Sequence, residues 1–149
     1  MRIRMATMDD AKHIARANIT LAREVEDLQF EYESALAGTK ALIHNEERGF
    51  YLVAEERGAI IGHLMVTFEW SDWRNKTIWW IHRVYIQEQW RGKGVFKQLF
   101  HEVKNMALRS NVFALRLYVF QENKEAMKTY EALEMEVAPF AIYQQVLSE

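Results

Sequence analysis

Three closely spaced segments rich in β-branched and aromatic residues, followed by an amphipathic helical pattern, constrain the fold of this chain most. The segments are residues 51–54, 59–68 and 77–86, and polar turns separate them. Such a series predicts an antiparallel meander of strands. Apolar residues then recur at helical spacing over residues 95–107, while charged and polar residues fill the other face. A sheet followed by such a helix is typical of an α/β fold.

Weaker patterns extend this prediction toward both ends of the chain. The N-terminal part predicts a strand over residues 3–6, a helix from about Ala11, and a second helical stretch over residues 28–43 that is interrupted at Gly38. The C-terminal part predicts a strand over residues 112–120, a helix over 123–133 and a strand over 140–147. The order β-α-α-β-β-β-α-β-α-β describes a mixed sheet packed with helices.

Length and composition indicate one domain over residues 1–149. The chain has 149 residues, no repeat or flexible linker, a single proline and 50% hydrophobic residues, which is enough for a full core. Its net charge of −2 argues against a surface that binds duplex nucleic acid, which needs clustered basic residues.

The residue types that are missing exclude several kinds of chemistry. With no cysteine, the chain has no disulfide, thiolate zinc site or cysteine nucleophile. Its five histidines are not paired at ligand spacing, so we expect no metal site. The N-terminus meets two acidic residues before any apolar stretch, and no segment reaches the ~18 apolar residues of a membrane span. We therefore expect a cytoplasmic protein that does not act on a membrane.

The junction between the third strand of the meander and the next helix is the segment most suggestive of chemistry. It contains Arg91-Gly92-Lys93-Gly94, directly before Val95. The first N–H groups of a helix have no internal partner and attract anions, and glycine lets a phosphate come close to the backbone. No Walker A loop is present, and Lys97 occupies the place of the third glycine of a dinucleotide fingerprint. The segment is either a phosphate site or merely a tight turn.

Two motifs resemble those of the GNAT N-acetyltransferase superfamily. Gln89-Trp90-Arg91-Gly92-Lys93-Gly94 matches the signature Gln/Arg-x-x-Gly-x-Gly/Ala, and the segment from Asn123 to Tyr130 resembles the family's Asn-x-x-Ala-x-x-x-Tyr. Residues 67–86 look most like the diamine acetyltransferase branch. The resemblance covers almost the whole chain and implies a mixed, mostly antiparallel twisted sheet flanked by helices. One departure is Glu134-Met135, where the family usually has Gly-Phe to turn the chain after the helix.

The resemblance implies a site for acetyl-CoA. It assigns the pyrophosphate to the backbone of residues 91–96, the pantetheine arm to the end of the preceding strand, and a further hydrogen bond to Asn123. The implied cofactor-binding residues are Val84, Tyr85, Ile86, Arg91, Gly92, Lys93, Gly94, Val95, Phe96 and Asn123. Phe96 departs from the small residue that many members carry there, so we expect altered packing at the phosphates.

The resemblance also implies two catalytic residues. Tyr130 would protonate the departing thiolate, although its place on an apolar helix face also suits a core tyrosine. His82 would be the base, since imidazole titrates near pH 6.5. Strand alternation places His82 on one face with Trp80, Val84 and Ile86, so a packed structural histidine is the alternative.

The acceptor site is the least defined part. At His82 and Arg83 the diamine branch carries Glu-Asp, and the positive charge of Arg83 argues against a polyamine acceptor. The acidic run that includes Glu26 and Glu31 is either a solvated face or a cation-attracting wall, and Trp80 could line the pocket. The candidate substrate-binding residues are Glu26, Glu31, Trp80 and Arg83.

The sequence therefore predicts an acetyl-CoA-dependent N-acetyltransferase in which a small-molecule or peptide amine attacks the thioester directly in a ternary complex. The alternative is a catalytically silent module that binds acyl-CoA as a sensor or interaction domain. Members of the family often dimerise, so a homodimer is consistent with the resemblance.

Overall fold

The computed structural model describes residues 1–148 of the chain. They form two compact units, one from Met1 to Tyr118 and a second that begins at Val119.

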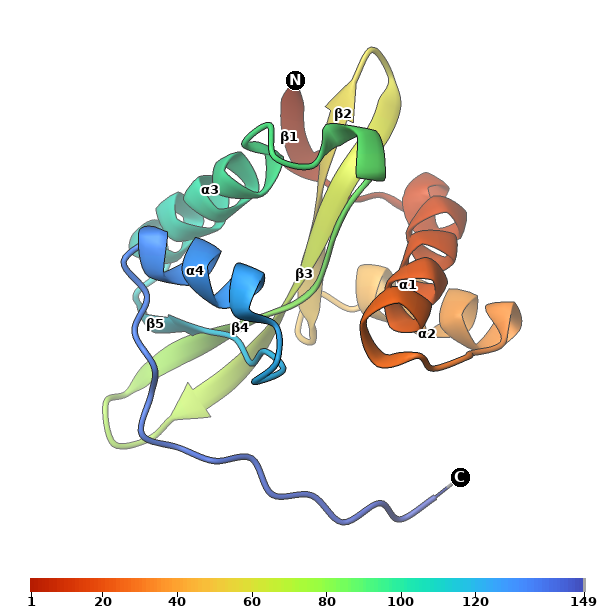
Figure 1. Ribbon diagram of the computed structural model, residues 1–149. Helices are drawn as coiled ribbons and strands as arrows, with labels where there is room; N and C mark the ends of the chain where they lie inside the picture. The colour runs from red at the N-terminus through yellow and green to blue at the C-terminus, as the bar shows by residue number, and fades with distance from the viewer. Residues whose placement is uncertain (149) are drawn as a thin grey trace. The chain divides into compact units, whose positions relative to one another are not determined.

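The first unit is built on one five-stranded sheet (Figure 1). Its strands are β1 (Arg2–Met5), β2 (Gly49–Glu56), β3 (Ala59–Ser71), β4 (Lys76–Ile86) and β5 (Val112–Arg116). They lie in sequence order, and each neighbouring pair is antiparallel except β4 and β5, which are parallel. The predicted meander and the mixed α/β sheet are confirmed.

Helices cover both faces of this sheet (Figure 1). On one face lie α1 (Ala11–Glu26) and α2 (Tyr32–His44), and on the other lies α3 (Val95–Arg109), which joins β4 to β5. The chain enters α1 through η1 (Met8–Asp10), where the Asp10 carboxylate accepts a hydrogen bond from the Thr7 N–H at 2.7 Å.

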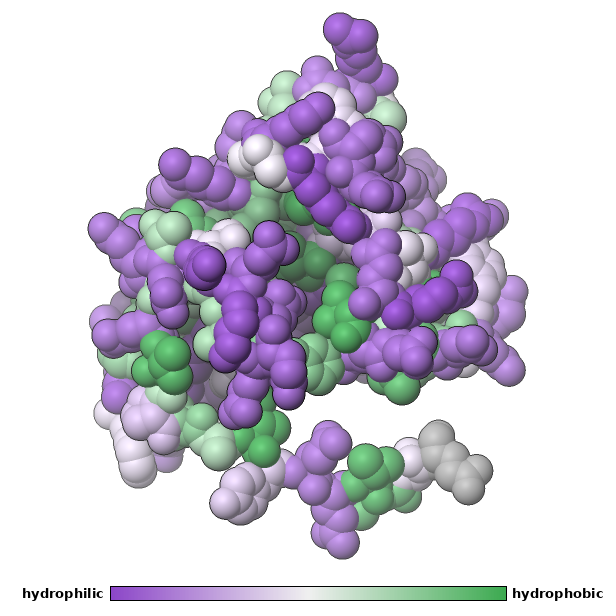
Figure 2. Space-filling model, in the orientation of Figure 1, coloured by the Kyte–Doolittle hydropathy of each residue, from purple (hydrophilic) through white to green (hydrophobic). Residues whose placement is uncertain are grey.

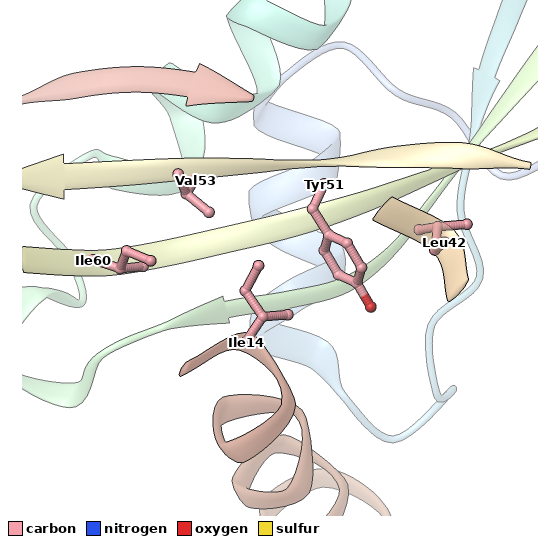
Figure 3. Close-up of a cluster of buried hydrophobic side chains, with 5 residues drawn as sticks. All are labelled: Ile14, Leu42, Tyr51, Val53 and Ile60. Carbon is pink, nitrogen blue, oxygen red and sulfur yellow. The ribbon is translucent and has the colours of Figure 1, made fainter. Parts of the chain in front are cut away.

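The core under α1 and α2 gathers side chains from four elements. Ile14 and Leu42 come from the two helices, and Tyr51, Val53 and Ile60 come from β2 and β3 (Figure 3). On the opposite face, α3 buries the apolar positions that its periodicity predicts, namely Val95, Leu99, Phe100, Val103 and Ala107. Both faces of the sheet are therefore covered by apolar side chains.

Two predicted boundaries in the first unit are wrong. Helix α2 runs through Gly38 without a break. One glycine in a helix costs about 1 kcal/mol, which the burial of Leu42 outweighs. Strand β5 ends at Arg116, whereas the sequence predicts a strand that continues to residue 120.

The second unit contains α4 (Lys124–Ala132), in agreement with the predicted helix. No helix or strand follows within residues 133–148, so the strand predicted over residues 140–147 is absent from the part of the chain described. Beyond residue 136, large apolar side chains of this segment are exposed (Figure 2): Val137, Phe140, Ile142, Tyr143, Val146 and Leu147. Strand propensity alone does not form a strand, because a strand needs a neighbour to hydrogen-bond.

Candidate functional site

Strand β4 runs on past the point where its pairing with β5 ends. The parallel ladder extends from Thr77 to Trp80, whose partner is Arg116 at the end of β5. From there β4 continues to Ile86, paired with β3 along its other edge. The β5-facing edge of this last part of β4 makes no ladder to another strand within residues 1–148. Such an edge can pair with an extended ligand that carries amide groups.

A β-bulge interrupts β4 at the start of this open edge. His82 lies opposite Met65 and Tyr85 lies opposite His63, so two residues of β4 face only Leu64. The first of the two, Arg83, has a φ of 52° in the left-handed region. A bulge of this kind bends a strand and redirects its side chains, and such bulges are common next to active sites.

The bulge corrects the face assignment that alternation predicts for β4. Tyr85 shares a face with His82, and the ring centroids of Tyr85 and His63 are 6.1 Å apart on that face. Ile86 points to the opposite face, where its side chain and that of Val95 both flank Gly62. The prediction that His82 lies on one face with Val84 and Ile86 is wrong, because the extra residue reverses the alternation beyond it.

His82 is held by contacts on three sides. Its Nε2 is 2.8 Å from the Thr67 hydroxyl, its ring stacks on Trp80 with centroids 6.5 Å apart, and it meets the Tyr118 ring in a T-shaped arrangement with centroids 5.5 Å apart. Partial burial, together with the charge of Arg83, lowers the pKa of His82 below its usual value. The imidazole is therefore neutral at pH 7 and is able to accept a proton.

Trp80 belongs to the same group of aromatic side chains. Its indole N–H donates to the Glu69 carboxylate at 2.7 Å, and the Arg116 guanidinium lies 6.0 Å from its ring centroid. Glu69 and Arg116 thus fix the ring on which His82 stacks.

The turn before α3 opens the end of the helix to solvent. Gly92 and Gly94 have φ values of 75° and 82°, and a Cβ placed on either would meet no atom within 4 Å. Gly94 is the N-cap, so no side chain caps the first turn, and the helix itself does not use the first N–H groups of α3. Lys93 is exposed beside them, with its ammonium 5.4 Å from the centroid of the Trp90 ring. The arrangement suits an anion.

Arg91 tethers this turn to its surroundings. Its Nε donates to the Ile86 carbonyl at 2.8 Å, and its guanidinium pairs with Glu24 of α1 at 3.0 Å. Its own backbone N–H donates to the Glu88 carbonyl at 3.2 Å. Arg91 therefore holds the turn beside α1, and the amides that point outward begin after it.

Tyr130 and Asn123 lie on α4, in the second unit. The Asn123 side chain caps the helix and accepts a hydrogen bond from the Ala126 N–H at 3.2 Å. Tyr130 follows seven residues later on the same helical face. Partial burial raises the pKa of Tyr130, so its phenol stays protonated at neutral pH and is able to donate a proton.

The two predicted acidic residues lie at the connection between α1 and α2. Glu26 is the last residue of α1, Glu31 immediately precedes α2, and both side chains are exposed. Neither makes a side-chain hydrogen bond or ion pair within residues 1–148.

Sequence reasoning missed a buried polar network beneath α1. His63 is fully buried, and its Nε2 lies 2.9 Å from the Asn18 Oδ1, while the Asn18 Nδ2 donates to the Tyr51 hydroxyl at 3.2 Å. The His63 Nδ1 has no hydrogen-bond partner within the described structure. Burial lowers the pKa of His63 to about 3. The sequence signal for this network is His63 itself, a titratable residue inside an otherwise apolar predicted strand.

No group of three potential metal ligands occurs among residues 1–148. No helix in the same range is long and apolar enough to cross a bilayer.

Comparisons with known proteins agree with these features. The sequence model of the acetyltransferase (GNAT) family matches residues 13–135. A thialysine N-epsilon-acetyltransferase from Mus musculus is 28% identical over 141 residues, which is 89% of this chain and 82% of that protein. The match to the Bos taurus protein of the same name is 31% identical but spans only 50% of this chain and 43% of that one. The crystal structure of a possible acetyltransferase from Clostridium difficile 630 superposes with a TM-score of 0.93 at 38% identity, over 99% of this chain and 98% of that one.

Proposed function

The chain belongs to the acetyltransferase (GNAT) family, and from that premise we propose that it transfers the acetyl group of acetyl-CoA to a primary amine by direct attack in a ternary complex. The observation that carries the proposal is the open edge of β4, which has His82 at one end and the glycine turn before α3 at the other.

The residues present fit acetyl-CoA. The absence of a Cβ at Gly92 and Gly94 leaves room in front of the first turn of α3, where the pyrophosphate would lie. Along Val84 to Ile86, β4 has no strand partner on its β5-facing edge within residues 1–148, so the amides of the pantetheine arm can pair there, while the Ile86 carbonyl already accepts from Arg91. The family motif assigns a further hydrogen bond with the arm to Asn123. When bound, the ligand supplies an activated acetyl thioester.

In this mechanism, His82 removes a proton from the acceptor nitrogen, directly or through a water molecule. It is suited to this role because its pKa is lowered, so the ring is neutral at pH 7. Thr67 and the stacked Trp80 keep the ring in one orientation. The backbone N–H groups near Tyr85 and Ile86 stabilise the oxyanion that forms when the amine adds to the acetyl carbonyl.

Tyr130 completes the reaction by donating its phenolic proton to the sulfur as the carbon–sulfur bond breaks. The proton taken up by His82 balances the one that Tyr130 gives, so the enzyme recovers its starting state after both groups exchange with solvent. No covalent enzyme intermediate is required.

The acceptor in this proposal is a small amine. In support, the two mammalian relatives bear the name of thialysine, an amino acid with a side-chain amine. The exposed side chains of Glu26 and Glu31 add negative charge that would attract such a group.

The first test is calorimetric titration with acetyl-CoA, CoA and desulfo-CoA. We expect micromolar binding of all three, because each carries the pyrophosphate and the pantetheine amides. If none of the three ligands binds, the proposal is contradicted before an acceptor is known.

The second test is a screen of amines with release of free thiol as the readout. We expect release with at least one amine and its loss in Tyr130→Phe, with acetyl-CoA affinity changed less than twofold. Tight binding of acetyl-CoA with no release across the screen would favour an acyl-CoA sensor over an enzyme.

A further inference from the structure

Arg83 occupies an unusual place in the fold. It lies in the β4 bulge, directly after His82, with its backbone in the left-handed conformation at a φ of 52°. Its side chain is exposed. Residues held in this region without being glycine cluster at binding sites, where the strain is tolerated because it aims a side chain.

The guanidinium of Arg83 has no partner within the described structure, in contrast to its neighbours. Arg91 pairs with Glu24 at 3.0 Å, and Arg116 lies 3.9 Å from Glu69. Within residues 1–148, the Arg83 side chain makes no ion pair, hydrogen bond or ring contact. The site thus presents one uncommitted cation with five N–H donors.

The charge of Arg83 acts on the face of the sheet that carries His82. After burial, it is the second cause of the lowered pKa of His82, and it opposes the rise that burial causes in the pKa of Tyr51. The side chains of His82 and Tyr51 lie on that face. Two carboxylates that contact residues of the site, Glu24 and Glu69, are bound to Arg91 and to Trp80. Neither carboxylate pairs with Arg83, so the charge of Arg83 is available to attract an anion.

We propose that Arg83 binds a carboxylate of the acceptor, so that the substrate is an amino acid held by its carboxylate while its amine is presented to His82. This inference rests on the function proposed above and specifies its acceptor class. A guanidinium matches a carboxylate with two parallel hydrogen bonds, which orients the acceptor as well as attracting it.

The experiment compares acceptors that differ only in the carboxylate. One set is lysine, lysinamide and 1,5-diaminopentane, and a second is alanine, alaninamide and ethylamine. Thiol release gives kcat/KM for each. We expect the amino acid of at least one set to exceed both of its analogues by tenfold or more.

The variant Arg83→Asn then tests the residue, since asparagine tolerates the left-handed conformation. We expect it to lower kcat/KM for the amino acid by tenfold or more, mainly through KM, and to leave the amide and the simple amine within twofold. Arg83→Lys should retain part of the preference for the amino acid, because lysine keeps the positive charge but lacks the two parallel N–H donors of the guanidinium.

The matched control is Arg57→Asn, which makes the same change at an exposed arginine with the same φ of 52° in the turn between β2 and β3. We expect it to keep the wild-type preference.

Two results would overturn the inference alone: equal rates with the amino acid and its amide in the wild type, or an equal loss on all three acceptors in Arg83→Asn. Failure of every acceptor to release thiol would instead remove the proposed function together with it.

Discussion

At the scale of single residues, the contacts of His82 decide what it can do. Thr67 holds its Nε2 at 2.8 Å, and Trp80 and Tyr118 enclose the ring. A base needs this kind of support, because a ring free to rotate would rarely point its lone pair at the substrate. Burial and the charge of Arg83 both favour the neutral form that a base requires.

The pH profile of acetyl transfer follows from this environment. Because the pKa of His82 is lowered, we expect kcat/KM to be constant through pH 7 and to fall only on the acid side of pH 6.5, as the ring gains a proton. His82→Gln should abolish this acid limb and lower kcat by about 10²-fold, the lower end of what a general base contributes. Thiol release between pH 5 and pH 8 measures both.

Two variants refine this test. Arg83→Asn removes a neighbouring positive charge, so the acid limb should move to higher pH. Thr67→Val should lower kcat, and Thr67→Ser, which keeps the hydroxyl, should not. An acid limb that persists in His82→Gln would show that another group is the base.

At the scale of elements, left-handed residues occur both before α3 and after α4. Glycines adopt this conformation before α3, whereas a glutamate adopts it after α4. In the turn before α3, Gly92 and Gly94 adopt it without strain. After α4, Glu134 adopts it with a φ of 67°, while its N–H donates to the Glu131 carbonyl and the Met135 N–H donates to the Tyr130 carbonyl. This is the hydrogen-bond pattern with which a glycine commonly ends a helix.

Alanine variants of two glycines with similar backbone conformations distinguish an effect on acetyl-CoA binding from an effect on folding stability. Gly94 and Gly58 have φ values of 82° and 80°, and neither has an atom within 4 Å of the place of a Cβ. Each change to alanine should cost about 1 kcal/mol of folding stability. Only Gly94→Ala places a methyl group in front of the α3 amides, so only it should weaken acetyl-CoA binding, by about tenfold or ~1.4 kcal/mol. Calorimetry and urea unfolding of both variants check this.

The end of α4 offers a stabilising change. Glu134→Gly should raise the stability of the helix end by up to about 1 kcal/mol, because it relieves the left-handed glutamate. Glu131→Gly is the matched control, since it makes the same change inside the helix and should destabilise by a similar amount. Urea unfolding followed by helical circular dichroism measures both. Equal loss in the two variants would contradict this account of the turn.

The elements also show what could be predicted from the sequence. The meander, α3 and α4 have periodicity or caps of their own, and the sequence located them within a few residues. The bulge at Arg83 could not be predicted, because apolar residues on both faces of β4 hide any change of alternation. The network of Asn18, Tyr51 and His63 joins residues far apart in the chain, so no local sequence pattern predicts it. The roles of Tyr130 and Asn123 were inferred from a motif and stay predictions.

At the scale of the whole molecule, a polar chain links α1 to two strands of the sheet. His63 of β3 contacts Asn18 of α1, and Asn18 contacts Tyr51 of β2. Since each partner comes from a different element, the network forms only when the first unit has assembled. It therefore contributes to global unfolding and not to local fraying.

The burial of His63 makes stability depend on pH. Its pKa is about 3 in the folded protein and about 6.5 when unfolded, so below pH 6.5 the unfolded chain binds a proton that the folded chain does not. Stability should fall as pH drops below 6.5, by about 1.4 kcal/mol per pH unit, or about 2 kcal/mol at pH 5. Urea unfolding at pH 7.5 and pH 5 measures this loss.

His63→Gln should reduce the difference between the two pH values, whatever it costs at pH 7.5, because glutamine does not titrate. His101→Gln, at an exposed position on α3, is the control for removing one histidine. The same pH difference in wild type and His63→Gln would contradict the assignment.

The bulge of β4 inserts one extra residue, which shifts the side-chain alternation of the rest of the strand. Every residue after Arg83 changes face relative to a regular strand, so Tyr85 joins His82 while Ile86 turns to α3. Deletion of one residue at the bulge would restore a regular ladder. The Tyr85 side chain would then lie on the face opposite His82, although no other residue had changed. In alignments of this family, a single gap at this position should thus mark loss or change of activity more reliably than most substitutions.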